Sequence, residues 1–188
     1  MTDESKTREA RIRDGDVRGA VARLRAKIGD LPVAMVTATD SRCLPTSRPL
    51  MTQQLDDEGA LWFFVPSVGT LARDVEVNPR VCATYSDLAR GVYVAMSGYA
   101  RLIYDPDRIF ALWDDELEAW FGQGPLDPRL ALLRVDVDHA EYWDEHSSGV
   151  IRLLALAHAA LLREPPLPAT EHCRLSLRDG NGSAPSPA

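Results

Sequence analysis

The sequence predicts a mainly β fold with flanking helices, an α+β domain built around a small antiparallel barrel. Six runs rich in β-branched and apolar residues recur along the chain and are candidate strands. Short loops with turn residues join most of these runs, and only short helical segments lie between them, which favours an antiparallel sheet. Apolar residues make up 45% and charged residues 26% of the 188 residues, as in an ordinary folded domain.

The first part of the chain predicts one helix followed by three strands. Apolar residues at helical spacing predict a helix over residues 5–28, and Pro32 ends the pattern. Turn residues at 40–42 and an acidic loop ending in Gly59 separate the strands that follow. The predicted strands cover residues 33–39, 47–54 and 61–65.

The middle of the chain predicts a short helix between strands. Thr70 is a candidate N-cap, and Pro79 sets the end of this helix because a proline restricts the residue before it. A fourth strand is predicted over residues 81–85 and a fifth over 92–103. Gly98 interrupts the fifth strand, which indicates a bulge or bend.

The last elements begin at Asp105, a candidate N-cap followed by a first-turn proline. The apolar residues that follow are expected to line one face of a single helix, and a sixth strand is expected within residues 130–143. The expected apolar face comprises Ile109, Leu112, Trp113, Leu117, Trp120 and Phe121. Ser147 or Ser148 opens a last predicted helix that ends near Leu162.

The predicted organisation is one domain with two tails. Residues 1–9 form a polar N-terminal tail, residues 10–163 form the domain, and residues 164–188 form a tail rich in Pro, Ser and Gly that we expect to be disordered. No apolar run approaches the ~18–20 residues that cross a bilayer, and the polar start carries no apolar signal core. We therefore expect a cytoplasmic protein with no membrane partner.

Composition and motifs exclude several classes of function. The net charge of −7 repels phosphate backbones and argues against nucleic-acid binding. The three cysteines and four histidines form no CxxC, HExxH or HxH pattern, so neither a disulfide framework nor a metal site is indicated. The chain also lacks the GxSxG, P-loop and GxGxxG motifs.

A set of short motifs, in a fixed order, carries a resemblance that spans about residues 10–162. The motifs are Ser47 to Thr52, Leu61 to Phe64, Asn78 to Val81, Tyr85 to Asp87, Tyr93 to Gly98, Leu112-Trp113, Ala119 to Phe121, Asp127-Pro128, Leu132 to Val135 and Glu141 to Asp144. Together they resemble the general stress protein branch of the pyridoxamine 5′-phosphate oxidase-like proteins. This resemblance implies a six-stranded antiparallel split β-barrel that forms a homodimer and holds FMN in two equivalent clefts across the dimer interface.

The resemblance also implies which residues contact FMN. Arg48 matches the arginine that reaches the flavin phosphate, and the strand Pro49, Leu50 and Met51 matches the segment that runs along the ring. The remaining implied contacts are Phe64 and Val65 at the ribityl chain and phosphate, Gly69, Thr70 and Leu71 in the phosphate loop, Tyr93 offered by the other subunit, and Trp143 near the ring.

Elementary chemistry agrees with such a site. A flavin needs an apolar slot for its ring and cations for its phosphate. Arg48 stands beside Pro49, which donates no ladder hydrogen bond and so suits a strand that faces a ligand. The loop of residues 66–69 leads into a predicted helix whose N-terminus favours an anion. Because a small barrel has little interior volume, any cofactor is expected outside it or between subunits.

The phosphate loop departs from the family pattern. Relatives commonly carry a serine and then lysine or arginine–lysine where this chain has Gly69, Thr70 and Leu71, and often a threonine where it has Val65. The leading hypothesis is a dimeric FMN-binding split-barrel protein that acts as a flavin-dependent oxidoreductase or as a flavin-binding stress protein, with substrate and catalytic residues unassigned. The alternative is a non-catalytic dimer that has lost flavin or binds a deazaflavin or haem. A third hypothesis is an interaction domain whose acidic segment, residues 105–145, contacts a basic partner.

Overall fold

A computed structural model of the chain describes residues 17–144 and 171–177, which form seven strands and three α-helices. The strands are β1 (Val33–Thr39), β2 (Pro45–Leu55), β3 (Ala60–Pro66), β4 (Arg80–Asp87), β5 (Val92–Ile103), β6 (Leu130–Asp144) and β7 (Glu171–Ser176). The helices are α1 (Val17–Ile28), α2 (Thr70–Val77) and α3 (Pro106–Leu112), followed by two 3-10 turns, η1 (Asp115–Ala119) and η2 (Gly124–Leu126).

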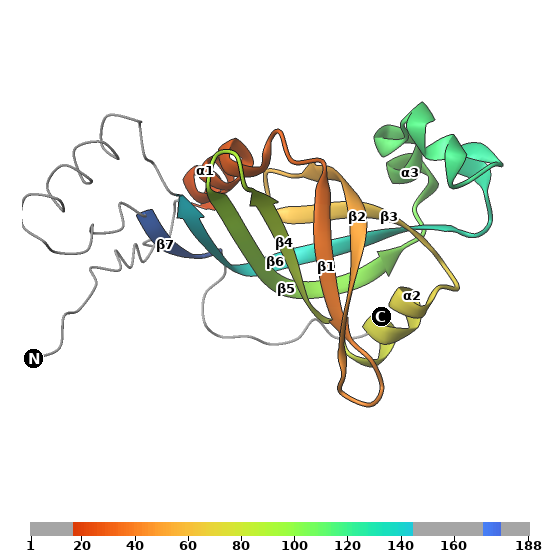
Figure 1. Cartoon of the computed structure of the whole chain (residues 1–188). Coiled ribbons are helices and arrows are strands. Elements are labelled where there is room, and N and C mark those ends of the chain that lie inside the picture. The colour runs from red at the N-terminus through yellow and green to blue at the C-terminus, as the bar shows by residue number, and fades with distance from the viewer. Residues whose placement is uncertain (1–16, 145–170, 178–188) are drawn as a thin grey trace, which may run out of the picture.

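The sheet closes on itself. Its strand order is β3-β2-β1-β4-β5-β6-β7, every neighbouring pair is antiparallel, and β3 also pairs with β6. The first half of β6 lies against β3 and its second half lies against β7, while β5 runs along the other edge (Figure 1). The predicted six-stranded antiparallel barrel is confirmed, with strand ends that differ by up to two residues.

Strand β7 corrects the prediction that residues 164–188 are a disordered tail. Cys173, Leu175 and Leu177 are buried and alternate with polar residues, which is the period of a half-buried strand. The Pro, Ser and Gly content of the flanking sequence masked this short alternation, so the prediction is wrong for residues 171–177. The predicted helix from Ser147 or Ser148 to Leu162 lies outside the described residues.

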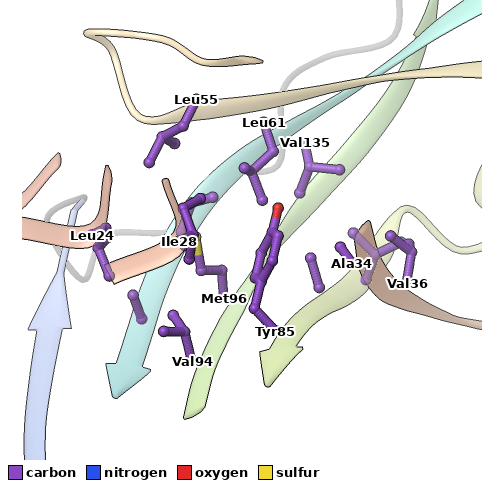
Figure 2. Close-up of a cluster of buried hydrophobic side chains, with 14 of the residues drawn as sticks. Leu24, Ile28, Ala34, Val36, Leu55, Leu61, Tyr85, Val94, Met96 and Val135 are labelled. Carbon is purple, nitrogen blue, oxygen red and sulfur yellow. The ribbon is translucent and has the colours of Figure 1, made fainter. Parts of the chain in front are cut away.

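The barrel interior is filled with side chains that alternate along the strands. Figure 2 shows Tyr85 standing among apolar side chains that include Leu61, Met96 and Val135. The Tyr85 hydroxyl shares a 2.8 Å hydrogen bond with the Thr52 hydroxyl, which satisfies the phenol inside the core. The core therefore leaves no room for a flavin-sized ligand inside the barrel, and ligands must bind on its outer surface.

Helices cover the two ends of the barrel. Figure 1 shows α1 at one end, with α2 and α3 at the other. The loop between β2 and β3 brings Gly59 between α1 and the end of β7, where an added Cβ would lie 2.8 Å from Leu177 and 3.4 Å from Val21. The first described helix and the last described strand thus meet at one mouth of the barrel.

The predicted irregularity in β5 is confirmed. The pairing of β5 with β6 shifts between Ser97 and Gly98. An added Cβ at Gly98 would lie 2.1 Å from the Asp136 carbonyl oxygen, so the backbones of the two strands approach too closely for any side chain there.

Two helix predictions need correction. Asp105 caps α3 as predicted, but α3 ends at Leu112 because Trp113 adopts an extended conformation and Asp114 starts the separate turn η1. The predicted single apolar face is therefore broken, and Trp120 is exposed. In α2 the N-cap is Gly69, which is extended, and Thr70 is the first helical residue.

The second half of the long predicted helix, α1, is confirmed within the described residues, and its buried face packs on the barrel. No helix in the described part of the chain has the length and apolar character needed to span a bilayer.

Candidate functional site

An apolar groove of about 280 Å³ lies on the outside of the barrel, beside β2 and β3. Its lining residues come from β2, from β3 and from the segment around η1, and they are Pro49, Leu50, Met51, Gln53, Phe64, Pro66, Leu117, Trp120 and Phe121. The structure thus brings together four residues that the sequence analysis assigned to a flavin ring and ribityl chain: Pro49, Leu50, Met51 and Phe64. The groove is the leading candidate for a ligand site.

Strand alternation decides which side chains reach this groove. Pro49 and Met51 point outward from β2 and are exposed. On β3, Phe64 belongs to the outer apolar cluster, whereas Val65 is 1% exposed and packs into the barrel core. Because the Val65 side chain is buried in the core, it is not available to a ligand in the groove.

The outer apolar cluster gives the groove a rigid wall. Phe64 packs edge-to-face against Trp113, with ring centroids 5.7 Å apart and planes at 75°. Leu117 and Phe121 are buried beside it, and Trp120 stays exposed at the groove. The sequence analysis had placed this segment in a helix and so missed its contribution, although an exposed tryptophan is a signal of binding.

Arg48 lies on the face of β2 opposite to Pro49, directly across from Val36 of β1. Its Nη2 donates to the Thr46 hydroxyl at 3.1 Å and to the Asp74 carboxylate of α2 at 3.5 Å. Its Nη1 is buried and has no hydrogen-bond partner within the described residues. A buried guanidinium nitrogen with unused donors fits an additional acceptor such as a phosphate oxygen.

The loop that follows β3 connects the groove to α2. Pro66 lines the groove, and the Gly69 main-chain nitrogen donates to its carbonyl at 3.2 Å. Thr70 is exposed, whereas Leu71 is 5% exposed and packs in the core. The assignment of the Leu71 side chain to a phosphate contact is therefore not supported by its placement, and Gly69 and Thr70 remain candidates.

A second arginine lies close to this loop. The Ser67 main-chain nitrogen donates to the Arg129 carbonyl at 2.7 Å. The Arg129 guanidinium donates through Nε and Nη2 to both carboxylate oxygens of Asp127, at 3.0 and 2.7 Å. These hydrogen bonds lower the pKa of Asp127 to about 2, so the pair stays ionised at neutral pH.

Tyr93 and Trp143 do not line the groove of their own chain. They face each other across the pairing of β5 and β6, whereas Phe64 aligns through Leu132 with Ile103 at the other end of β5. On the other side of the barrel, Pro49 aligns through Met35 and Thr84 with Ala95, two residues from Tyr93, so β5 lies three strand spacings, or about 14 Å, from β2. The structure does not bring them to the groove within one subunit.

Strand β7 adds a partner to Trp143 that the sequence analysis missed. His172 stacks on the Trp143 ring, with centroids 4.9 Å apart and planes at 10°. Glu141 lies 3.4 Å from the His172 Nε2 and pairs with Arg174 at 2.7 Å. The assignment of the C-terminal segment to a disordered tail concealed this cluster.

A second hollow lies on the outer face of β1, β4, β5 and β6. It encloses about 300 Å³ and is lined partly by polar side chains, including Thr37, Arg80, Ser97 and His139. Within residues 17–144 and 171–177, no group of three or more His, Cys, Asp or Glu side chains could hold a metal ion. The hollow therefore offers no metal centre.

Comparison with known proteins identifies the family. The model of the pyridoxamine 5′-phosphate oxidase-like family matches residues 19–166. The chain belongs to this family. No curated protein sequence matches it. The resemblance inferred from the ordered motifs is confirmed.

Solved structures of this family share the fold. A structure from Jannaschia sp. CCS1 assigned to general stress protein 26 is 24% identical, with a TM-score of 0.67, and the match covers 84% of this chain and 98% of that one. The general stress FMN/FAD binding protein of Xanthomonas citri is 30% identical, with a TM-score of 0.59, over 67% of this chain and 89% of that one. An FMN binding protein from Nostoc punctiforme PCC 73102 is 19% identical, with a TM-score of 0.58, over 70% and 85%.

Proposed function

We propose that this protein is an FMN-binding homodimer of the general stress type that catalyses oxidoreduction of a small molecule. The observation that carries the proposal is the groove in which Pro49, Leu50, Met51 and Phe64 meet. The family resemblance assigned these residues to the flavin, and they line one apolar slot on the barrel surface. The Xanthomonas citri relative, described as FMN/FAD binding, supports the same ligand class.

The outer face of the sheet supports a dimer. Val33 and Met35 of β1 and Met51 of β2 are 44%, 42% and 37% exposed, and the residues in line with Met35 on β4 and β5 are the small Thr84 and Ala95. Contiguous exposed apolar side chains on one sheet face are typical of a protein interface. A partner docked on this face adds a second wall to the groove beside Met51.

The partner also explains Tyr93 and Trp143. Neither residue lines the groove of its own chain. In a twofold dimer, residues far apart in one subunit approach each other across the interface. We therefore assign Tyr93 and Trp143 to the site of the opposite subunit.

The residues of the groove define what this chain contributes to the chemistry. Bound flavin supplies hydride or electron transfer at its ring. Pro49, Met51 and Phe64 orient the ring and exclude water from its face, and Arg48 holds the anionic tail. The lining residues carry no titratable side chain, so the groove positions reactants and does not transfer protons.

The same absence of titratable side chains from the groove lining favours a second candidate, a non-catalytic dimer that holds a deazaflavin or another planar ligand in the same slot. The lining contains no histidine or cysteine to serve as a haem ligand. Deazaflavin is therefore the better fitted of the alternative ligands named above.

The test is an absorption spectrum of the purified protein followed by titration with FMN, read as quenching of flavin fluorescence. Arg48→Ala should weaken FMN affinity about tenfold or more, because a charge-assisted hydrogen bond contributes about 1.5–3 kcal/mol. Arg42→Ala, which removes an exposed arginine from the β1–β2 turn, is the matched control and should bind FMN normally.

Three outcomes decide between the proposals. FMN binding is supported if wild type and Arg42→Ala bind about one flavin per subunit and Arg48→Ala loses it. Protein that ignores FMN but binds a deazaflavin supports the second candidate. Unchanged FMN affinity in Arg48→Ala contradicts the assigned role of that residue.

A further inference from the structure

We propose that Asp74 neutralises the phosphate end of the flavin site, so that this chain selects only weakly for FMN over riboflavin. The inference rests on the proposed function, because it concerns the same site. It names the ligand class more narrowly: a flavin recognised by its ring, with little discrimination for a terminal phosphate monoester.

The first step is the contact between Arg48 and Asp74. The Arg48 Nη2 lies 3.5 Å from the Asp74 Oδ2, and the two side chains are 26% and 15% exposed. A partly buried pair is screened less by water and salt than a surface pair. The positive charge expected to receive the phosphate is thus already opposed by a carboxylate from α2.

The second step is the loop at the start of α2. Gly69 has no side chain and Leu71 is directed into the core. Thr70 is exposed and offers a hydroxyl, which is a neutral donor. The loop of residues 66–71 carries no cationic side chain, so it attracts a dianion less than a loop with a lysine or arginine would.

The third step concerns the other arginines near the loop. Arg129 donates to both oxygens of Asp127 and is therefore engaged. Arg73, in the first turn of α2, is exposed, and water and salt screen an exposed charge. Neither guanidinium makes up for the opposing charge of Asp74.

These contacts predict how much of the binding free energy comes from the flavin ring and how much from the phosphate. The apolar groove treats the rings of FMN and riboflavin alike, because the two molecules differ only at the ribityl end. A phosphate monoester carries about −1.5 to −2 charges at pH 7, and Arg48 together with Asp74 presents a net charge near zero. Wild-type protein should therefore prefer FMN over riboflavin by less than about tenfold.

The experiment measures dissociation constants for FMN and riboflavin by quenching of flavin fluorescence. It uses the full chain as wild type, as Asp74→Asn and as Glu76→Gln. Asp74→Asn keeps the side-chain shape but frees the Arg48 charge, so FMN affinity should rise about tenfold while riboflavin affinity stays the same. Glu76→Gln removes an equal charge from an exposed position of the same helix and should change neither constant.

The outcomes separate this inference from the proposed function. Wild-type protein that binds FMN more than about tenfold more tightly than riboflavin overturns the inference and leaves flavin binding intact. An Asp74→Asn protein with unchanged FMN affinity, or with equal gains for both flavins, also overturns it. Failure of wild type and variant to bind either flavin overturns the proposed function itself.

Discussion

Single residues decide what the barrel core and the groove can do. Tyr85 brings a hydroxyl into an otherwise apolar interior, and burial raises the pKa of Tyr85 to about 12. Leu71 is also buried, because its helical spacing with Ala72 and Val75 places it on the core face of α2. Matching Leu71 to a family motif suggested a ligand contact, whereas the periodicity of its own helix indicates burial.

The Tyr85 pKa predicts a loss of stability in alkali. Between pH 10 and 12 the folded protein keeps the phenol proton that the unfolded chain releases, so the free energy of unfolding falls as pH rises. A shift of two units corresponds to at most about 3 kcal/mol. Urea unfolding at about pH 8 and about pH 11.5 should show this decline in wild type and a smaller one in Tyr85→Phe.

At neutral pH, Tyr85→Phe should cost about 0.5–1.5 kcal/mol for the lost hydrogen bond with Thr52. Tyr104→Phe alters an exposed tyrosine and should keep the wild-type alkaline decline. An equal alkaline decline in wild type and Tyr85→Phe would contradict the assigned cause.

Secondary-structure elements were predictable where their own pattern was strong. The six barrel strands follow from alternating or continuous apolar runs bounded by turn residues, as in Val33–Thr39. The break after α3 was not predictable from apolar spacing, because it depends on Asp114 capping a new turn. Strand β7 was missed because its three apolar positions lie in a polar segment and are buried only when the strand pairs with β6.

The pairing of β7 with β6 predicts that residues of β7 contribute unequally to the free energy of unfolding. Leu175→Ala removes a side chain that is fully buried in the main core and should lower the free energy of unfolding by about 2–4 kcal/mol. Arg174→Ala removes an exposed ion pair with Glu141 and should cost less than about 1 kcal/mol. Denaturant unfolding of both variants measures the difference, and equal small effects would show that β7 does not belong to the cooperative core.

At the scale of the whole molecule, the sequence predicted the barrel but did not predict where the groove lies or which segments line it. The groove requires β2, β3 and the η1 segment to meet in space, and Trp120 enters it only because the expected helix is broken. Tyr93 and Trp143 have no neighbours at the groove in one chain. Residue patterns report local periodicity, whereas a site shared between distant segments depends on closure of the sheet.

The dimer proposal predicts the effect of a charge on the apolar sheet face. Met35→Glu places a carboxylate among Val33 and Met51 and should yield monomers, because an unpaired charge buried in an interface is strongly unfavourable. Light scattering after gel filtration measures the mass, and FMN affinity should fall together with dimerisation. Leu88→Glu, at an exposed turn between β4 and β5, should remain dimeric. A Met35→Glu protein that stays dimeric would place the interface elsewhere.

The meeting of Val21 and Leu177 over Gly59 has a consequence for synthesis of the protein. A ribosome releases a chain from its N-terminus, so β7 emerges after all six barrel strands. Until Leu175 and Leu177 are synthesised, the apolar core surface beneath α1 is exposed to water and to other nascent chains. Completion of the barrel is therefore a late event in synthesis.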